Sequence, residues 1–368
     1  MKRVLIIGAY GNFGSYISRV LASDGNIQII IAGRSLKKAN IFSKTIDARN
    51  KPEIVAIDIN ENFDISLASL KPDIVIHTSG PFQTQDYHVA ETCIAQGCHY
   101  IDLSDGRDFV SGISKLDQKA KAKSVMVISG ASSVPCLTSA LVDHYKNNFK
   151  MLEKLDYGIT TAQKTNRGLA TTTAILSYTG RQFKTLIRGE MKGVYGWQDL
   201  HARKYPEIGW RLLGNCDVPD LALFPDRYPE LKSIRFFAGL EISFIHLGLW
   251  FISWLVRLRV LRQLEKYAGL LLRISYLFDF IGSDNSAFHM QMTGTDREGS
   301  EKKIIFDLIA RSGDGPYIPC MPVIIMAKKL ANDEIMEWGA SPCMGFITLE
   351  EYLGALEPMD IHWHTTEA

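Results

Sequence analysis

Near its start the chain reads Val4-Leu5-Ile6-Ile7-Gly8-Ala9-Tyr10-Gly11-Asn12-Phe13-Gly14-Ser15. The four leading apolar residues predict a short buried strand, and the three glycines that follow are spaced three apart. Apolar residues then recur at helical intervals, at Ile17, Val20 and Leu21. The pattern predicts a strand, a tight glycine turn and a helix. Such a unit brings backbone N–H groups and a helix N-terminus to one point, which suits a pyrophosphate.

Buried strands and helices alternate six times along the first part of the chain. The predicted strands are continuous apolar runs, which is typical of a parallel sheet covered on both faces. They lie at 4–7, 27–32, 53–59, 73–78, 99–103 and 124–129. This part of the sequence therefore predicts an α/β fold with an N-terminal doubly wound Rossmann domain.

After Gly130 the predicted strands become longer and more amphipathic. The sequence predicts strands at 152–162, 184–197 and 234–240, and a hairpin formed by 287–295 and 302–310. Such strands favour an inserted α+β second domain with a mainly antiparallel sheet. Residues 203–232 contain four prolines and are predicted to be a long irregular excursion.

The C-terminal part returns to helical sequence at Met321–Ala331 and near 349–356, and ends in a short extended piece at 361–364. We expect this tail to pack back on the Rossmann domain. The predicted division is 1–133 for the Rossmann domain, 134–316 for the inserted second domain, and 317–368 for the returning segment.

The end of the second predicted strand discriminates between the two nicotinamide cofactors. Domains that bind NAD place Asp or Glu there to hold the ribose 2′-hydroxyl. This chain reads Gly33-Arg34-Ser35 instead. A guanidinium and a hydroxyl can bind a 2′-phosphate, which a carboxylate would repel, so the sequence favours NADP(H). The alternative is that Arg34 is only a solvated residue at a helix start.

Three polar, glycine-containing loops follow the fourth, fifth and sixth predicted strands, at 78–82, 103–106 and 130–135. Ligands of doubly wound sheets bind along this carboxyl edge, and we expect the first loop beside the nicotinamide ribose. Asp58 could accept a hydrogen bond from the adenine amino group or be an exposed strand end. The predicted cofactor site comprises Gly8, Tyr10, Gly11, Asn12, Phe13, Gly14, Arg34, Ser35, Asp58, Ser79, Gly80 and Pro81.

Three groups of residues are considered for acid–base or metal chemistry. Asp105 is the candidate for a group near the reacting centre, and it is equally plausible as a carboxylate that caps the following helix. Tyr228 and Lys232 have the Tyr-x-x-x-Lys spacing of short-chain dehydrogenases, but they lie in the proline-containing excursion and we interpret the match as chance. The cysteines and histidine at 93–99 lack the usual zinc spacing, so no metal site is predicted.

Composition excludes some functional classes. The net charge of +1, without a dense basic run, does not suggest nucleic-acid binding. Six cysteines in 368 residues and no signal peptide favour reduced thiols and a cytoplasmic location.

Residues 242–281 are unusually apolar. Ile242–Val256 has 15 residues with one histidine and no full charge, which is below the ~20 needed to span a bilayer. A second apolar helix is predicted at 268–281. On length, we favour a helical pair buried in the second domain or at a dimer interface. The alternative is a peripheral membrane contact with tryptophans at the interface and arginines at the headgroups, and hence a membrane-associated protein.

Four runs in the first part of the chain resemble the saccharopine dehydrogenase-like family. They are 8–14, 32–35, 79–87 and 98–106. Three later runs, 248–250, 293–296 and 313–319, are similar to bacterial members of that family. The resemblance implies a Rossmann domain, a discontinuous second domain, NADP(H) as cofactor and a homodimer. It does not imply a substrate.

Together these observations predict an NADP(H)-dependent oxidoreductase of the saccharopine dehydrogenase-like family. We expect hydride transfer to or from a C=N, C=O or C=C bond of an unidentified small molecule. The alternative is an NADP(H)-binding sensor, or a membrane-associated scaffold, without turnover.

Overall fold

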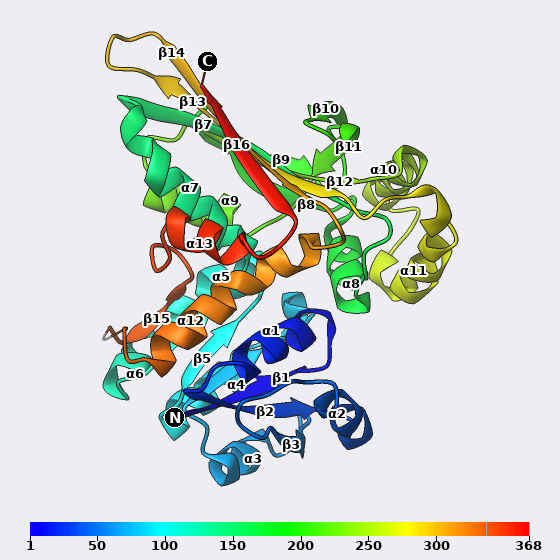
Figure 1. Cartoon of the computed structure of the whole chain (residues 1–368). Coiled ribbons are helices and arrows are strands. Elements are labelled where there is room, and N and C mark those ends of the chain that lie inside the picture. Colours follow the sequence, from blue (N-terminus) through cyan, green and yellow to red (C-terminus); the bar gives the residue numbers. More distant parts are fainter. Residues whose placement is uncertain (336, 368) are drawn as a thin grey trace. The chain divides into compact units, whose positions relative to one another are not determined.

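The computed structural model describes residues 1–335 and 337–367, which form two compact units (Figure 1). The first unit comprises Met1–Ala140 and Tyr317–Tyr352. The second comprises Leu141–Pro316 and the residues from Leu353 on. Both units contain a seven-stranded sheet.

The sheet of the first unit is parallel throughout, in the order β3-β2-β1-β4-β5-β6-β15. Its first six strands have the Rossmann order and confirm the predicted doubly wound fold. The central strands are apolar on both faces and fully buried, as a sheet between two helical layers requires. The strands are β1 (Lys2–Ile7), β2 (Ile27–Gly33), β3 (Glu53–Ala56), β4 (Ile74–His77), β5 (His99–Asp102), β6 (Met126–Ser129) and β15 (Gly339–Pro342).

Helices from distant parts of the sequence cover this sheet. α1 (Asn12–Ala22) packs on β1 and β2, and α12 (Met321–Ala331) packs beside α1 on β4 and β5 (Figure 1). Eight of the eleven residues of α12 are buried, so the returning segment supplies part of the core. The other helices are α2 (Leu36–Ser43), α3 (Phe63–Leu70), α4 (His88–Gln96), α5 (Arg107–Gly112) and α6 (Asp117–Ala122).

The sheet of the second unit has the order β10-β11-β12-β7-β13-β14-β16. Only β7 and β12 pair in parallel, so the predicted mainly antiparallel sheet is confirmed. One face is a core of aromatic and sulfur side chains, among them Tyr157, Phe236, Met290 and Phe306. The strands are β7 (Met151–Thr161), β10 (His201–Tyr205), β11 (Gly209–Asn215), β12 (Ser233–Leu240), β13 (Ser286–Thr295), β14 (Glu301–Ala310) and β16 (Ile361–Glu367).

Two segments of the second unit differ from their predicted structure. The single strand predicted at 184–197 is a hairpin of β8 (Gln182–Ile187) and β9 (Glu190–Tyr195). Arg188 and Gly189 both have positive φ, 54° and 81°, and this pair reverses the chain as in a tight hairpin turn. The predicted irregular excursion at 203–232 instead contains most of the β10–β11 hairpin and the helix α9 (Asp220–Arg227).

The C-terminal tail divides between the two units. α12 and α13 (Leu349–Leu356) begin and end where the sequence predicts. The expectation that all of 317–368 packs on the Rossmann domain is wrong for the last part, because β16 pairs with the open edge of β14 in the second unit. The first unit also extends to Ala140, beyond the predicted boundary at 133.

The remaining helices of the chain are α7 (Thr138–Tyr145), α8 (Leu169–Tyr178), α10 (Ser243–Arg257) and α11 (Ala268–Tyr276). α10 and α11 form the apolar pair expected from the sequence. Among the described residues, none of the helices combines the length and the apolar character that crossing a bilayer needs.

Candidate functional site

The glycine turn after β1 leaves no room for larger residues. Gly8 has a φ of +83°, and a Cβ atom there would lie 2.6 Å from the hydroxyl oxygens of Thr78 and Ser79. A Cβ at Gly14 would lie 2.2 Å from the Gly8 carbonyl oxygen. The Gly11 amide donates to that same carbonyl at 2.8 Å. The turn therefore brings β1, α1 and the end of β4 closer together than any side chain allows.

The start of α1 fits a phosphate group. Its N-cap is Gly11, which has no side chain that would compete for the amides of the first turn. Asn12 and Phe13 begin the helix, and Ile17 and Leu21 anchor it in the core. Eleven residues of helix give this end a partial positive charge that an anion neutralises.

Tyr10 joins the glycine turn to the turn after β2. Its hydroxyl oxygen accepts a hydrogen bond from the Ser35 amide at 2.9 Å. Its ring covers Gly33, where a Cβ atom would lie 2.5 Å from the tyrosine oxygen. Two predicted cofactor-binding segments are thus held together by one side chain.

The turn after β2 presents cations and no carboxylate. Arg34 is exposed and forms no hydrogen bond or ion pair within the described part of the chain. Ser35 caps α2, with its hydroxyl accepting from the Lys38 amide at 3.3 Å. Lys37 and Lys38 add two exposed lysines to the first turn of α2, which contains no acid. This set of donors fits a 2′-phosphate.

We expect Tyr10→Phe to weaken dinucleotide binding modestly. The substitution removes only the acceptor of the Ser35 amide, so the loss should be about 1 kcal/mol, or about fivefold in affinity. Titration of NADPH fluorescence measures it. An affinity equal to that of the unmodified chain would show that the Tyr10–Ser35 hydrogen bond does not shape the site.

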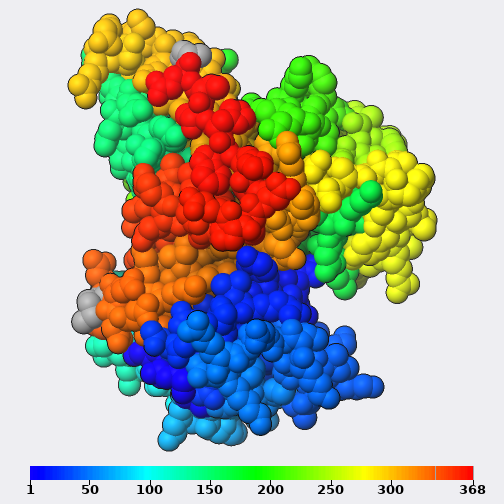
Figure 2. Space-filling view, viewed as in Figure 1, coloured from blue at the N-terminus to red at the C-terminus, as the bar shows by residue number. Residues whose placement is uncertain are grey.

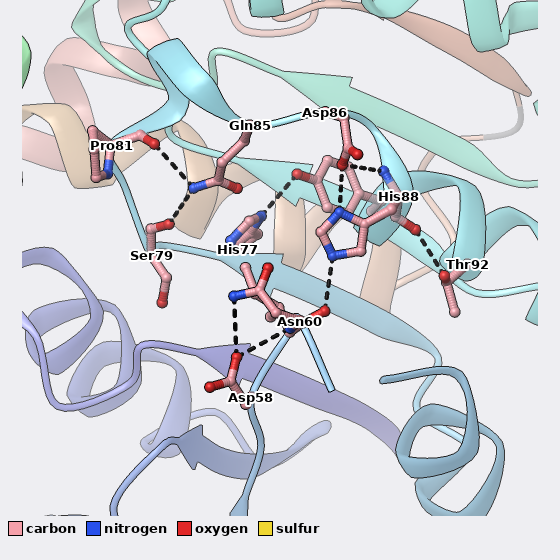
Figure 3. A network of polar contacts seen from close by, with 11 residues as sticks. Asp58, Asn60, His77, Ser79, Pro81, Gln85, Asp86, His88 and Thr92 are labelled. Carbon is pink, nitrogen blue, oxygen red and sulfur yellow. Dashed lines mark hydrogen bonds and ion pairs between the residues drawn. The ribbon is translucent and has the colours of Figure 1, made fainter. Parts of the chain in front are cut away.

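A glutamine holds the loop after β4 in shape (Figure 3). The Gln85 side-chain amide donates to the Ser79 carbonyl at 2.8 Å and to the Pro81 carbonyl at 3.1 Å. The Thr78 hydroxyl donates to the Ile7 carbonyl at 2.9 Å, which ties the start of the loop to β1. The loop predicted beside the nicotinamide ribose therefore has a fixed backbone next to the glycine turn.

A second connection holds the loop after β3 (Figure 3). Asp58 accepts hydrogen bonds from the Asn60 amide at 3.0 Å and from its side chain at 3.2 Å. His88, at the start of α4, donates from Nε2 to the Ile59 carbonyl at 2.8 Å and contacts the Asp86 carboxylate with Nδ1. The His88 ring lowers the pKa of Asp86 below its ordinary value. The adenine contact of Asp58 stays a prediction.

The carboxyl ends of β4 and β5 carry two buried titratable residues, His77 and Asp102, that the sequence did not single out. His77 Nδ1 lies 3.1 Å from the hydroxyl of Tyr100. Asp102 accepts from the Ser104 amide at 2.8 Å and from the Gly130 amide at 2.9 Å, so it ties together the loops after β5 and β6. The one sequence signal is a titratable residue that ends an otherwise apolar strand.

Burial shifts both of these titratable groups toward their neutral forms. It lowers the pKa of His77 to about 3, with the nearby His88 as a smaller cause. It raises the pKa of Asp102 to about 6, against the hydrogen bonds from Gly130 and Ser104 that favour the charged form.

Asp105 lies in an exposed position in the loop after β5. Its carboxylate accepts a hydrogen bond from the Gln83 side chain at 2.9 Å. The following helix, α5, has Gly106 as its N-cap and no side-chain cap, so the structure does not support the capping role. Its catalytic role stays a prediction.

The motifs that we interpreted as chance have structural roles. Tyr228 is buried and donates to Asp143, whereas Lys232 pairs with Glu153. The cysteines at 93 and 98 are buried free thiols. Among residues 1–335 and 337–367, no group of acidic, histidine and cysteine side chains could hold a metal ion.

The second unit contains a polar pocket of about 570 Å³ on its sheet. Arg203, from β10, lines it and forms an ion pair with the buried Asp307 at 3.0 Å. His289, which also lines it, forms a buried hydrogen bond of 2.8 Å with Tyr205. The pocket is large enough for a metabolite-sized ligand.

The fold of the first unit and the carboxyl edge of its sheet define a class of protein. A Rossmann sheet whose glycine turn, helix N-terminus and basic β2–α2 turn converge on one edge is a dinucleotide-binding domain. Residues 4–128 match the model of the saccharopine dehydrogenase NADP binding domain. This match spans the Rossmann part of the chain and supports the predicted resemblance to the saccharopine dehydrogenase-like family. A domain of this kind supports an oxidoreductase that uses a nicotinamide cofactor.

Solved structures and a curated relative add to this result. Apo saccharopine dehydrogenase (L-Glu forming) from Saccharomyces cerevisiae has a TM-score of 0.68 and 13% identity, with both chains covered in full, and supports the fold. Amine dehydrogenase from Mycobacterium smegmatis reaches only 0.49, with 9% identity and 95% of each chain covered. A lipid droplet localized protein from Caenorhabditis elegans is 25% identical over 157 residues, which cover 40% of this chain and 36% of that relative.

Proposed function

We propose that this chain is an NADP(H)-dependent oxidoreductase that acts on a C=N, C=O or C=C bond of a small molecule. The turn after β2 carries this proposal. There Arg34 stands exposed and unpaired in the described chain, with no carboxylate in the first turn of α2, and Tyr10 ties the turn to the glycine turn. A carboxylate at this position would instead select NAD.

Each part of the edge has a role in this proposal. The first-turn amides of α1 would hold the pyrophosphate, and Arg34 with Ser35 the 2′-phosphate. Asp58 would face the adenine, and the Gln85-braced loop Ser79–Pro81 the nicotinamide ribose. The chemistry that NADP(H) supplies when bound is transfer of a hydride.

We expect Arg34→Ala to weaken NADPH binding about 10- to 100-fold and to leave NADH binding unchanged. The guanidinium would contribute about 1.5–3 kcal/mol through charged hydrogen bonds to the 2′-phosphate, which NADH lacks. Lys123→Ala removes an equal charge from an exposed site at the end of α6 and serves as the control. Equal losses for both cofactors would remove Arg34 from the 2′-phosphate site.

Turnover distinguishes the enzyme from a sensor or scaffold that binds NADP(H) without reaction. A panel of ketones, imines and enones, followed by NADPH absorbance, should identify at least one substrate class. Asp105→Asn should lower its turnover without changing NADPH affinity if Asp105 acts near the reacting centre. Tight NADPH binding with no oxidation across the panel would favour the sensor.

A further inference from the structure

The exposed large apolar side chains of this protein concentrate in one segment. Twenty such side chains are exposed in the described chain, and twelve of them lie between 244 and 281. They are Phe244, Leu247, Phe251, Leu258, Val260, Tyr267, Leu270, Ile274, Tyr276, Leu277, Phe280 and Ile281. This segment runs through α10 and α11, coloured yellow-green to yellow in Figures 1 and 2. We call it the apolar hairpin (residues 243–281).

Both helices of the apolar hairpin are apolar on two sides. Their inner sides pack on one buried cluster, which comprises Leu176 of α8, Leu264 and Ala268; Leu249 and Ile252 of α10 and Leu271 of α11 lie against it. Their outer sides carry the exposed residues. On α10 these are Phe244, Leu247 and Phe251, at the three- and four-residue spacing of one helix face. Leu270 and Ile274 on α11, and Leu277 at its C-cap, have the same spacing. Burial within the unit therefore accounts for the inner sides only, and no element of the described chain covers the outer sides.

The charged residues of the apolar hairpin are mainly cations. Four are exposed and form no ion pair within the described chain: Arg259, Arg262, Lys266 and Arg273. Arg257 is engaged inside the unit, since it donates to Gln198 at 2.6 Å and lies over the Tyr195 ring. Its two acids, in contrast, are neutralised by arginines outside the hairpin. Glu265 pairs with Arg181 at 2.8 Å and Asp279 with Arg167 at 2.5 Å. The exposed apolar surface is thus accompanied by an uncompensated positive charge.

This positive charge discriminates between two partners that could cover the outer sides, a second copy of the chain and a lipid surface. In a two-fold homodimer the same patch would face itself, so the four free cations of one copy would lie in the same interface as the four of the other. Such a contact opposes like charges, which is unfavourable at an interface. An anionic lipid surface is complementary to both properties, because it accepts apolar side chains between its headgroups and attracts arginine and lysine.

We propose that the apolar hairpin docks this chain onto an anionic phospholipid surface, with its outer sides inserted among the headgroups and its arginines at the phosphates. The helices lie in the interface, since neither is long enough to cross it. This inference is independent of the proposed oxidoreductase activity, because it uses no residue of the cofactor edge.

Co-sedimentation with vesicles tests the docking. One set of vesicles is phosphatidylcholine alone and the other contains about one third phosphatidylserine. We expect the full chain to bind the anionic vesicles at least about tenfold more tightly than the neutral ones, and less tightly as salt is raised. The triple variant Phe251→Ser, Leu277→Ser and Phe280→Ser should lose this binding, since these side chains are 59%, 69% and 78% exposed and are not needed for packing.

Two further variants sharpen the test. Arg259→Gln with Arg262→Gln should remove the preference for anionic vesicles while the apolar surface is unchanged. Trp210→Ser with Ile65→Ser, which removes equally exposed apolar groups elsewhere, should bind as the unmodified chain does. The proposal is overturned by absence of binding to either vesicle, by equal binding to both, or by a dimer in sedimentation equilibrium that the triple variant abolishes. The last result would assign the patch to a second copy and support the predicted homodimer.

Discussion

Gly14→Ala is expected to abolish NADP(H) binding while the chain still folds. The added Cβ would lie 2.2 Å from the Gly8 carbonyl oxygen and 2.9 Å from the Thr78 hydroxyl. The first of these contacts is with backbone, so α1 must move away from β1 and the amides of its first turn move with it. The expected loss of NADPH affinity is on the order of 100-fold or more, and the cost in stability about 1–3 kcal/mol. Fluorescence titration and urea unfolding measure the two effects.

Gly354→Ala is the matched control. Gly354 lies inside α13, and a Cβ there meets no atom within 4 Å. This variant should bind NADPH normally and be more stable by about 0.5–1 kcal/mol, because alanine favours helix. If Gly14→Ala instead bound NADPH within about threefold of the unmodified chain, close approach at the glycine turn would not be what makes the site.

The second large effect concerns the pH dependence of stability, to which His77 and Asp102 contribute with opposite sign. His77 has a pKa lowered from 6.5 to about 3, so its neutral form stabilises the fold above pH 6.5, and this contribution is lost as pH falls toward 3. Asp102 has a pKa raised from 3.8 to about 6, so its contribution is present below pH 3.8 and is lost as pH rises through 6. The two contributions amount to about 5 and about 3 kcal/mol.

Between pH 4 and 6 these two slopes have opposite sign and should nearly cancel. Asp102→Asn should leave the His77 slope, so the free energy of unfolding falls by about 1.4 kcal/mol per pH unit as pH decreases. His77→Asn should leave the Asp102 slope, and stability then falls as pH increases over the same range. Urea unfolding at several pH values compares the slopes, which a general destabilisation does not change. Parallel curves for all three proteins would show that neither group titrates as a buried residue.

Features that depend on neighbouring residues could be predicted from the sequence. The glycine turn is recognised because its strand, its three glycines and its helix are contiguous. The six strands of the Rossmann domain are recognised because each is a continuous apolar run. The basic turn at Arg34 is recognised for the same reason, since it directly follows a predicted strand. The structure describes each of these where the sequence placed it.

Features that depend on distant pairing could not be predicted. The short strand β15 (Gly339–Pro342) is a seventh member of the Rossmann sheet only because β6 offers it an edge. The polar strand β16 joins the second sheet for the same reason. The hydrogen bond from Ser35 to Tyr10 and the buried contact of His77 with Tyr100 join residues that lie more than twenty positions apart. No local pattern indicates such pairs.

The apolar hairpin shows a limit of a different kind. Length alone favoured burial or dimerisation over membrane contact for 242–281. The structure shows that one helix pair has both a packed side and an exposed side, and helix length contains no information on how the two are divided.

Titration of the unmodified chain with NADPH and with NADH, followed by cofactor fluorescence, tests the central claim most directly. We predict saturable binding of NADPH, at least about tenfold tighter than that of NADH, because only the 2′-phosphate can engage Arg34. Saturation by neither cofactor, or NADH binding as tight as that of NADPH, would contradict the account.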